Sequence, residues 1–459
     1  MIALMSSMKI PKTYLLIIVI IAFNLPACRK PGLESLPDII LITIDTLRPD
    51  HLAVYGYERR TAPFISSIAD RGYIFDNCYA TSSWTAPSMA SLFTGIYPRG
   101  HGVLHGFVGA GKIVNQEKLD SSLPTLAELL KSRGYHTFGI STNGHVTPET
   151  GMARGFDEFV SLWFRDAEEA HQASLDLKEK VKNSRPYFFW IHYFDPHAPY
   201  RFRRPWIEGY SSDPVSARKW AEENMKELRR KRAIVTSDPK NRSALVDLYD
   251  SEINYTDEFL RRLFDEVLSP QSCLIIITSD HGEGFLEHGL LGHGNSLFEE
   301  VVKVPLIVKM PEEEERPVNI SAPVSIVDVV PSVLDFLGIS VPELVQGKSF
   351  LSLMNNSSPM KPRPIFCELD RGRHLKSIRR GRWKLIRKSG KKRAGLLYDL
   401  KADSAEENDV SGENQKVAGL LHRALISWQK QTPSFKAPRG EFVSKGEEKE
   451  VLKSLGYLH

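Results

Sequence analysis

The chain has 459 residues, 42% of them hydrophobic and 25% charged, with a formal net charge of +4. This length allows a large core and more than one domain, and the composition is that of an ordinary globular protein. The small charge and the lack of a basic stripe interleaved with aromatic residues argue against a nucleic-acid partner. Four cysteines are too few for a disulfide framework or a cysteine-only zinc site.

The first 28 residues have the pattern of an export signal. Lys9 and Lys12 precede an apolar run at residues 14–23, which is short for a membrane span. The following Leu25-Pro26-Ala27-Cys28 resembles a bacterial lipobox. We therefore expect a lipoprotein-type signal peptide over 1–28, a lipid anchor on Cys28 and a linker over 29–36. An uncut signal anchor is the alternative, and either would hold an exported protein at a membrane of the bacterial cell envelope.

Two unbroken apolar runs predict strands buried on both faces, and each ends in acidic side chains. Residues 38–44 lead into Asp45, and residues 272–278 lead into Asp280 and His281. In open α/β sheets, ligands bind beyond the carboxyl ends of parallel strands. On this segment alone, Asp45 is either a ligand or the cap of the next turn.

Strands and helices alternate over the first three quarters of the chain. We expect further strands over 73–79, 135–141, 187–194 and 304–308, and helices over 61–71, 123–134, 245–263 and 325–337. The alternation predicts an α/β fold with a large, mostly parallel sheet flanked by helices. We assign this domain to residues 37–345, with a charged, solvated helical insertion at about 211–240.

The composition becomes more basic and more broken from about residue 347. Strands over 375–386 and 396–400 and a closing helix over 415–429 are expected there. They predict a smaller C-terminal α+β subdomain with an antiparallel sheet over residues 346–459.

A hydroxyl residue stands where a helix is expected to begin. In the stretch 82–95, Thr85 is predicted to lie just before the helix start, with Pro87 two positions on. Free backbone N–H groups and the helix dipole favour an anion at such a place. Thr85 is therefore a candidate nucleophile for a phosphate or sulfate ester, and a plain N-cap is the other interpretation.

The strand-end residues and this hydroxyl predict a site for a divalent cation. Asp45, Asp280, His281 and Thr85 could hold Ca²⁺, Mg²⁺ or Mn²⁺ through oxygen, and the imidazole also admits Zn²⁺. Such an ion would stabilise the alkoxide of Thr85 and polarise an ester oxygen.

Two histidines on loops after other strands could act on the same ester. His197 and His293 could bind a tetrahedral anion or protonate the leaving oxygen. A single histidine in a proline-rich loop can equally make only a loop hydrogen bond.

From about Asp38 to its end, the chain resembles the sulfatase family of the alkaline-phosphatase superfamily. The matching segments are residues 44–52, 85–95, 192–200, 279–283, 292–294, 381–386, 397–400 and 455–457. The resemblance implies a role for each matching position. The metal would be held by Asp45, Asp280, His281 and Thr85; Thr85 would be the nucleophile, His197 and His293 would contact the ester anion, and Asn143 is a further candidate for that pocket.

Two departures from the family pattern change the expected chemistry. Sulfatases carry a Cys or Ser that is converted to formylglycine within Cys/Ser-x-Pro-x-Arg, whereas this chain has Thr85, with Met89 at the Arg position. Threonine cannot give that aldehyde, so we expect no formylglycine. Thr46 also follows Asp45 where many relatives have a second aspartate, so one metal ligand is absent or replaced.

These features predict a sulfatase-like, metal-dependent ester hydrolase with Thr85 as a covalent nucleophile. Its substrate would be a sulfated or phosphorylated small molecule, glycan or lipid. A phosphate ester, diester or phosphonate is favoured, because water can attack phosphorus in a threonine ester, as in sulfatase-like phosphodiesterases of the superfamily. The alternatives are a phosphoethanolamine- or phosphoglycerol-type transferase and a catalytically impaired, glycan-binding pseudosulfatase.

Overall fold

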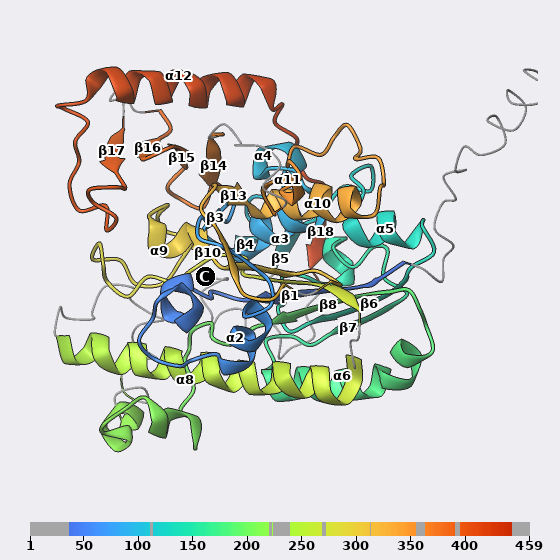
Figure 1. The fold of residues 1–459 in the computed structure, drawn as a ribbon. Coiled ribbons are helices and arrows are strands. Elements are labelled where there is room, and N and C mark those ends of the chain that lie inside the picture. Colours follow the sequence, from blue (N-terminus) through green and yellow to red (C-terminus); the bar gives the residue numbers. More distant parts are fainter. Residues whose placement is uncertain are drawn as a thin grey trace, which may run out of the picture. The chain divides into compact units, whose positions relative to one another are not determined.

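The computed structural model describes residues 36–110, 113–219, 223, 239–268, 272–312, 314–354, 363–390 and 395–442. The expected signal peptide, nearly all of the linker, most of the charged insertion and the segment 455–457 lie outside these residues. The chain divides after Leu36. The following description concerns the part that begins at Pro37 (Figure 1).

An eight-stranded sheet lies at the centre of this part (Figure 1). Its order is β12-β2-β11-β9-β1-β8-β6-β7. In that order the strands span Val318–Ile320, Tyr73–Phe75, Leu306–Lys309, Cys273–Thr278, Asp38–Ile44, Tyr187–Tyr193, His136–Ser141 and Glu158–Ser161. β11 runs antiparallel to both neighbours, and the other adjacent pairs are parallel. This confirms the predicted α/β fold with a large, mostly parallel sheet.

Helices cover both faces of the sheet (Figure 1). On one face lie α2 (Pro63–Ala69), α6 (Ala167–Lys182) and α8 (Pro239–Leu263); on the other lie α3 (Thr85–Thr94), α5 (Leu126–Lys131) and α10 (Val329–Phe336). The central strands β1, β8 and β9 are therefore buried along their whole length. That burial explains why their sequences are continuous apolar runs. Shorter helices are α4 (Pro98–His101), α9 (Glu299–Val302) and α11 (Leu351–Met354).

Two predicted strands are each divided in two, which corrects the expectation of single strands over 73–79 and 304–308. The second piece of one is β3 (Cys78–Tyr79), and the first piece of the other is β10 (Lys303–Val304). These pieces pair in a separate three-stranded sheet with β13 (Val324–Ser325). Pro305 separates β10 from β11 because it has no N–H to donate to either ladder.

A smaller antiparallel sheet lies in the C-terminal part. It consists of β14 (Ile365–Leu369), β15 (Leu375–Arg380), β16 (Trp383–Lys388) and β17 (Leu396–Asp399), and α12 (Gln415–Gln431) packs on it. This confirms the predicted sheet and closing helix, while the boundary at residue 346 stays a prediction. We did not expect β18 (Arg439–Phe442), which returns to pair with β5 (Ile113–Glu117) beside β4 (Phe107–Ala110).

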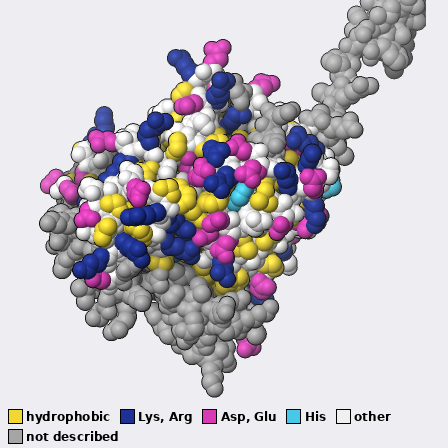
Figure 2. Space-filling view, turned by 90° about the horizontal axis from the view of Figure 1, so that it is seen from below, with side chains coloured by type: hydrophobic (Ala, Val, Ile, Leu, Met, Phe, Trp, Pro, Cys, Tyr) yellow, Lys and Arg dark blue, Asp and Glu magenta, His cyan; other side chains and the backbone are white. Residues whose placement is uncertain are grey.

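The distribution of surface charges agrees with the small net charge of the chain. Acidic and basic side chains are interspersed over the face shown in Figure 2. Within the described residues, no helix is both long and apolar enough to cross a membrane. Cys78, Cys273 and Cys367 are buried free thiols.

A buried ion cluster joins the C-terminal sheet to the rest of the chain. Lys384 in β16 is 1% exposed. Its Nζ lies 2.8 Å from Oε1 of Glu299 and 3.0 Å from Oε1 of Glu406. Burial alone would lower the pKa of Lys384, but the two carboxylates raise it above its usual value.

We expect Lys384→Met to reduce the free energy of unfolding by about 3–5 kcal/mol, because it leaves Glu406, which is fully buried, and Glu299, whose side chain is 16% exposed, without their ammonium partner. Urea denaturation followed by fluorescence would measure the loss. Lys388→Met, at the exposed end of the same strand, is the matched control and should change stability by less than about 0.5 kcal/mol. Equal effects of the two substitutions would contradict a stabilising role for the cluster.

Candidate active site

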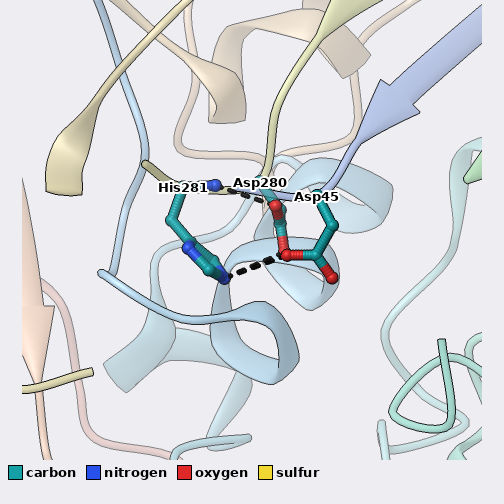
Figure 3. Close-up of side chains that lie close together, drawn as sticks. All are labelled: Asp45, Asp280 and His281. Carbon is teal, nitrogen blue, oxygen red and sulfur yellow. Dashed lines mark hydrogen bonds and ion pairs between the residues drawn. The ribbon is translucent and has the colours of Figure 1, made fainter. Parts of the chain in front are cut away.

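Three residues predicted to bind a metal come together where two neighbouring strands end. Asp45 follows β1, and Asp280 and His281 follow β9, which pairs with β1 in parallel. All three are fully buried, and one ligand atom from each lies within 4.8 Å of the others. Figure 3 shows both carboxylates and the imidazole turned toward one another. The parallel pairing thus brings acids that are far apart in the sequence to one point.

The imidazole of His281 presents a lone pair to the two carboxylates. Its Nδ1 lies 2.9 Å from the carbonyl oxygen of Gly282. Since a carbonyl oxygen only accepts, Nδ1 carries the proton. Nε2 lies 3.5 Å from Asp45 Oδ1 and 3.3 Å from Asp280 Oδ2, longer than charge-assisted hydrogen bonds of about 2.7–2.9 Å. The three atoms therefore face one another as electron-pair donors.

A divalent cation fits this arrangement. Oδ1 of Asp45 and Oδ2 of Asp280 accept no hydrogen bond from any described residue, although buried oxygens are normally satisfied. In the metal-free protein, burial and then the charge of Asp280 raise the pKa of Asp45 well above its usual value. A bound cation would relieve both effects. Two carboxylates and an imidazole are compatible with each of the four metals considered above.

The other oxygen of Asp45 is held by Asn143 and lies near His192. Nδ2 of Asn143 donates a hydrogen bond of 2.7 Å to Asp45 Oδ2, and Nε2 of His192 lies 3.5 Å from the same oxygen. Asn143, which we expected in the substrate pocket, is thus in contact with the candidate metal site. His192 was not predicted, although its place near the end of β8, beside β1, could have indicated it.

Backbone strain marks the residue after Asp45. Thr46 has a φ of 57°, which is a genuine outlier for a β-branched side chain. Its carbonyl accepts a 2.7 Å hydrogen bond from the hydroxyl of Tyr249. Its own buried Oγ1 has no hydrogen-bond partner among the described residues. Thr46 stands where many relatives are expected to have a second aspartate. This position therefore still carries a buried oxygen, Oγ1, on a strained backbone.

Thr85 is the first residue of α3, and its hydroxyl lies beside His281. The N-cap is Trp84, in an extended conformation with φ −165° and ψ 163°. The expected position of Thr85 before the helix was thus wrong by one residue, and so was the plain N-cap interpretation. Thr85 is 1% exposed, and its Oγ1 lies 3.3 Å from Nε2 of His281. The hydroxyl therefore faces the nitrogen that also faces the two carboxylates.

Three more imidazoles surround the site. The ring of His293 lies 4.4 Å from that of His281 and 4.8 Å from that of His197, measured between centroids. His145, which the sequence analysis missed, packs edge-on against Trp84 at 5.5 Å. Burial is the first cause that lowers the pKa values of both His145 and His197 well below the usual value. These two rings are therefore neutral near pH 7, and the N–H at Nδ1 of His197 donates to the carbonyl oxygen of Ala198 at 2.6 Å.

Glu283 orients His293. Its Oε1 lies 3.0 Å from Nδ1 of His293, and its Oε2 accepts a 3.2 Å hydrogen bond from Tyr200. Burial raises the pKa of Glu283, although the nearby imidazoles and the Tyr200 hydroxyl act against that rise. Nε2 of His293 is thereby left as the nitrogen that can act on a substrate.

We expect Glu283→Gln to lower kcat by about 10–100-fold with little change in KM, the range for partners that orient a functional imidazole. Steady-state kinetics on the substrate found by the screen described below would measure it. Glu266→Gln, in a side chain that is 47% exposed, serves as the control. A rise in KM alone would show that Glu283 does not act through His293.

One further residue comes from the C-terminal sheet. Arg371 lies between β14 and β15, and its Cζ is 4.9 Å from the centre of the Trp84 ring. Arg371 was not predicted from the sequence, because β14, which ends two residues before it, was not among the expected strands.

Family models match most of the chain. A model described as Sulfatase covers residues 37–339. A second, described as N-sulphoglucosamine sulphohydrolase, C-terminal, covers residues 287–431.

Individual proteins are similar over the same region. An uncharacterised sulfatase of Escherichia coli, YidJ, is 24% identical over 381 residues, which is 73% of each chain. The structure of BT4656 in complex with its substrate D-glucosamine-2-N,6-O-disulfate superposes with a TM-score of 0.69 at 21% identity, over 86% of this chain and 98% of that one. The phosphonate monoester hydrolase of Agrobacterium radiobacter superposes with a TM-score of 0.67 at 20% identity, over 86% and 96%.

Proposed function

The chain belongs to the sulfatase family, and we propose that it is a metal-dependent hydrolase that uses Thr85 as a covalent nucleophile on phosphorus esters. The observation that carries this proposal is the position of Thr85 Oγ1, 3.3 Å from His281 Nε2, at the point where Asp45 and Asp280 meet. An activated nucleophile is needed at this position, and the hydroxyl of Thr85 occupies it.

Asp45, Asp280 and His281 would hold the metal, with Thr85 completing the set. A bound divalent cation lowers the pKa of a coordinated hydroxyl and polarises an ester oxygen. Asn143 keeps the carboxylate of Asp45 in place through its 2.7 Å hydrogen bond.

The remaining side chains serve the leaving group. Thr85 Oγ1, without its proton, forms a bond to phosphorus while the bond to the leaving alcohol breaks, and that alcohol oxygen takes a proton from protonated His293. A water molecule then gives a proton to His293, attacks the same phosphorus and displaces Oγ1 of Thr85, which restores both residues. Glu283 keeps His293 in the orientation that the proton transfer needs.

Two features support phosphorus over sulfur. Thr85 lacks the chemistry that lets a formylglycine hydrate expel sulfate, and the buried Met89 offers no charge where the family's arginine would stand. The fold itself permits either ester, because a 2-O GAG sulfatase and a phosphonate monoester hydrolase share it. Phosphate esters, diesters and phosphonates are therefore the favoured substrates.

A screen of aryl sulfate, phosphate monoester, phosphodiester and phosphonate substrates with Mn²⁺, Zn²⁺ and Ca²⁺ tests the proposal. We expect turnover of one or more phosphorus esters. Turnover of the aryl sulfate alone would overturn the choice of phosphorus. Products on an added acceptor alcohol would indicate a transferase, and no turnover with any metal would indicate a pseudosulfatase that only binds glycans.

The location of the protein is part of the same proposal. Export and acylation of Cys28 would place the enzyme at the bacterial cell envelope, where phosphorylated or sulfated glycans and lipids are met. Incorporation of labelled palmitate, lost in Cys28→Ser, would support it.

A further inference from the structure

Arg371 stands between the two segments that carry the proposed nucleophile and acid. Its guanidinium lies over Trp84, the residue before Thr85. Its Nη1 lies 3.1 Å from where a Cβ on Gly294 would be, and Gly294 directly follows His293. A side chain from the C-terminal sheet thus reaches both segments.

The charge of Arg371 acts within the site. After burial, it is the largest cause of the lowered pKa of His145. A positive charge that disfavours protonation of a nearby imidazole equally favours a negative charge on a bound molecule. An arginine fork matches carboxylate, sulfate and phosphate groups.

Depth separates Arg371 from the reacting groups. Thr85, Asp280 and His281 are at most 1% exposed, while Arg371 is half-buried on a loop whose next residues, Gly372 and Arg373, are exposed. The buried groups thus receive the transferred group, and Arg371, nearer the solvent, meets what projects from it.

We propose that Arg371 forms a subsite for the alcohol part of the substrate. The substrate is an ester whose alcohol part carries a second negative charge, and Arg371 binds that charge. This inference rests on the proposed function, because it takes Thr85 as the point of attack.

The test compares two esters that differ in one charge, 4-carboxyphenyl and 4-carbamoylphenyl methylphosphonate. Binding to Thr85→Ala protein is measured by calorimetry, so that it does not depend on turnover. Arg371→Gln should weaken binding of the carboxyphenyl ester about 10–100-fold, the range for a hydrogen bond to a charged group. Binding of the carbamoylphenyl ester should change by less than about threefold. Arg371→Lys, which keeps the charge but loses the fork, should lie between.

Arg373→Gln, on the same loop with the same charge, is the matched control and should leave both esters unchanged. Equal weakening of both esters by Arg371→Gln, equal effects of Arg373→Gln, or no binding of the carboxyphenyl ester would overturn the subsite. The nucleophile is judged separately: if Thr85→Ala protein hydrolyses these esters as fast as the wild type, the proposed function fails whatever Arg371 does.

Discussion

Thr85→Ala is expected to lower kcat by about 10³-fold or more, because it removes the oxygen that forms the bond to phosphorus. Alanine is favourable in a helix, so α3 should keep its structure. Steady-state kinetics with the best substrate of the screen, together with thermal unfolding, would measure both effects.

Two further substitutions in α3 make this result specific. Thr85→Ser keeps the hydroxyl and should retain activity to within about tenfold. Ser88→Ala removes a hydroxyl one turn away, whose hydrogen bond goes to the carbonyl of Ser82 at 3.0 Å, and should leave kcat unchanged. If Thr85→Ala and Ser88→Ala had equal effects, the role of Thr85 would be structural.

Asp45→Asn should abolish activity and also make the protein's stability insensitive to added metal. In the wild type, a bound ion stabilises the folded state by mass action, so Mn²⁺, Zn²⁺ or Ca²⁺ should raise Tm. The asparagine removes one of two facing carboxylates, so the variant should lose most of that rise. Thermal unfolding with chelator and with each metal would measure it, with Asp70→Asn, an exposed residue, as control.

The metal-free proteins should also differ in their dependence on pH. The pKa of Asp45 is raised in the folded state, so folded wild type holds the proton more tightly than the unfolded chain. Its stabilising contribution is present below the unfolded pKa of about 3.9 and is lost as pH rises toward the raised value. Asp45→Asn should lack this loss and unfold at a higher temperature than metal-free wild type at neutral pH. The reverse order would contradict repulsion between the two carboxylates.

Much of this site could be predicted because it follows from strand ends. The apolar runs before Asp45 and Asp280 predicted buried parallel strands, and parallel strands place their carboxyl ends together. The division of the strand expected over 304–308 was not predicted, because a single apolar run does not indicate which sheet each half joins. The pairing of β10 with β3, and of β11 with β2 and β9, determines the two sheets.

The parts that were not predicted depend on contacts between distant segments. Asn143 was expected near the ester, but its hydrogen bond to Asp45 depends on the order of β1, β8 and β6 in the sheet. Arg371 has no periodic or motif signal, because its position results from the packing of the C-terminal sheet. Thr46 was recognised as a departure, but its positive φ is visible only in the folded backbone.

The separation of Asp45 from Asp280 along the chain has a consequence for metal selection during biogenesis. A growing polypeptide that has reached residue 272 holds only one of the two acids, and it cannot form the site until β9 is inserted beside β1. A metal held by both acids can therefore be bound only once β9 has paired with β1. Its binding would then draw on the free-metal pool of the compartment in which these two strands pair.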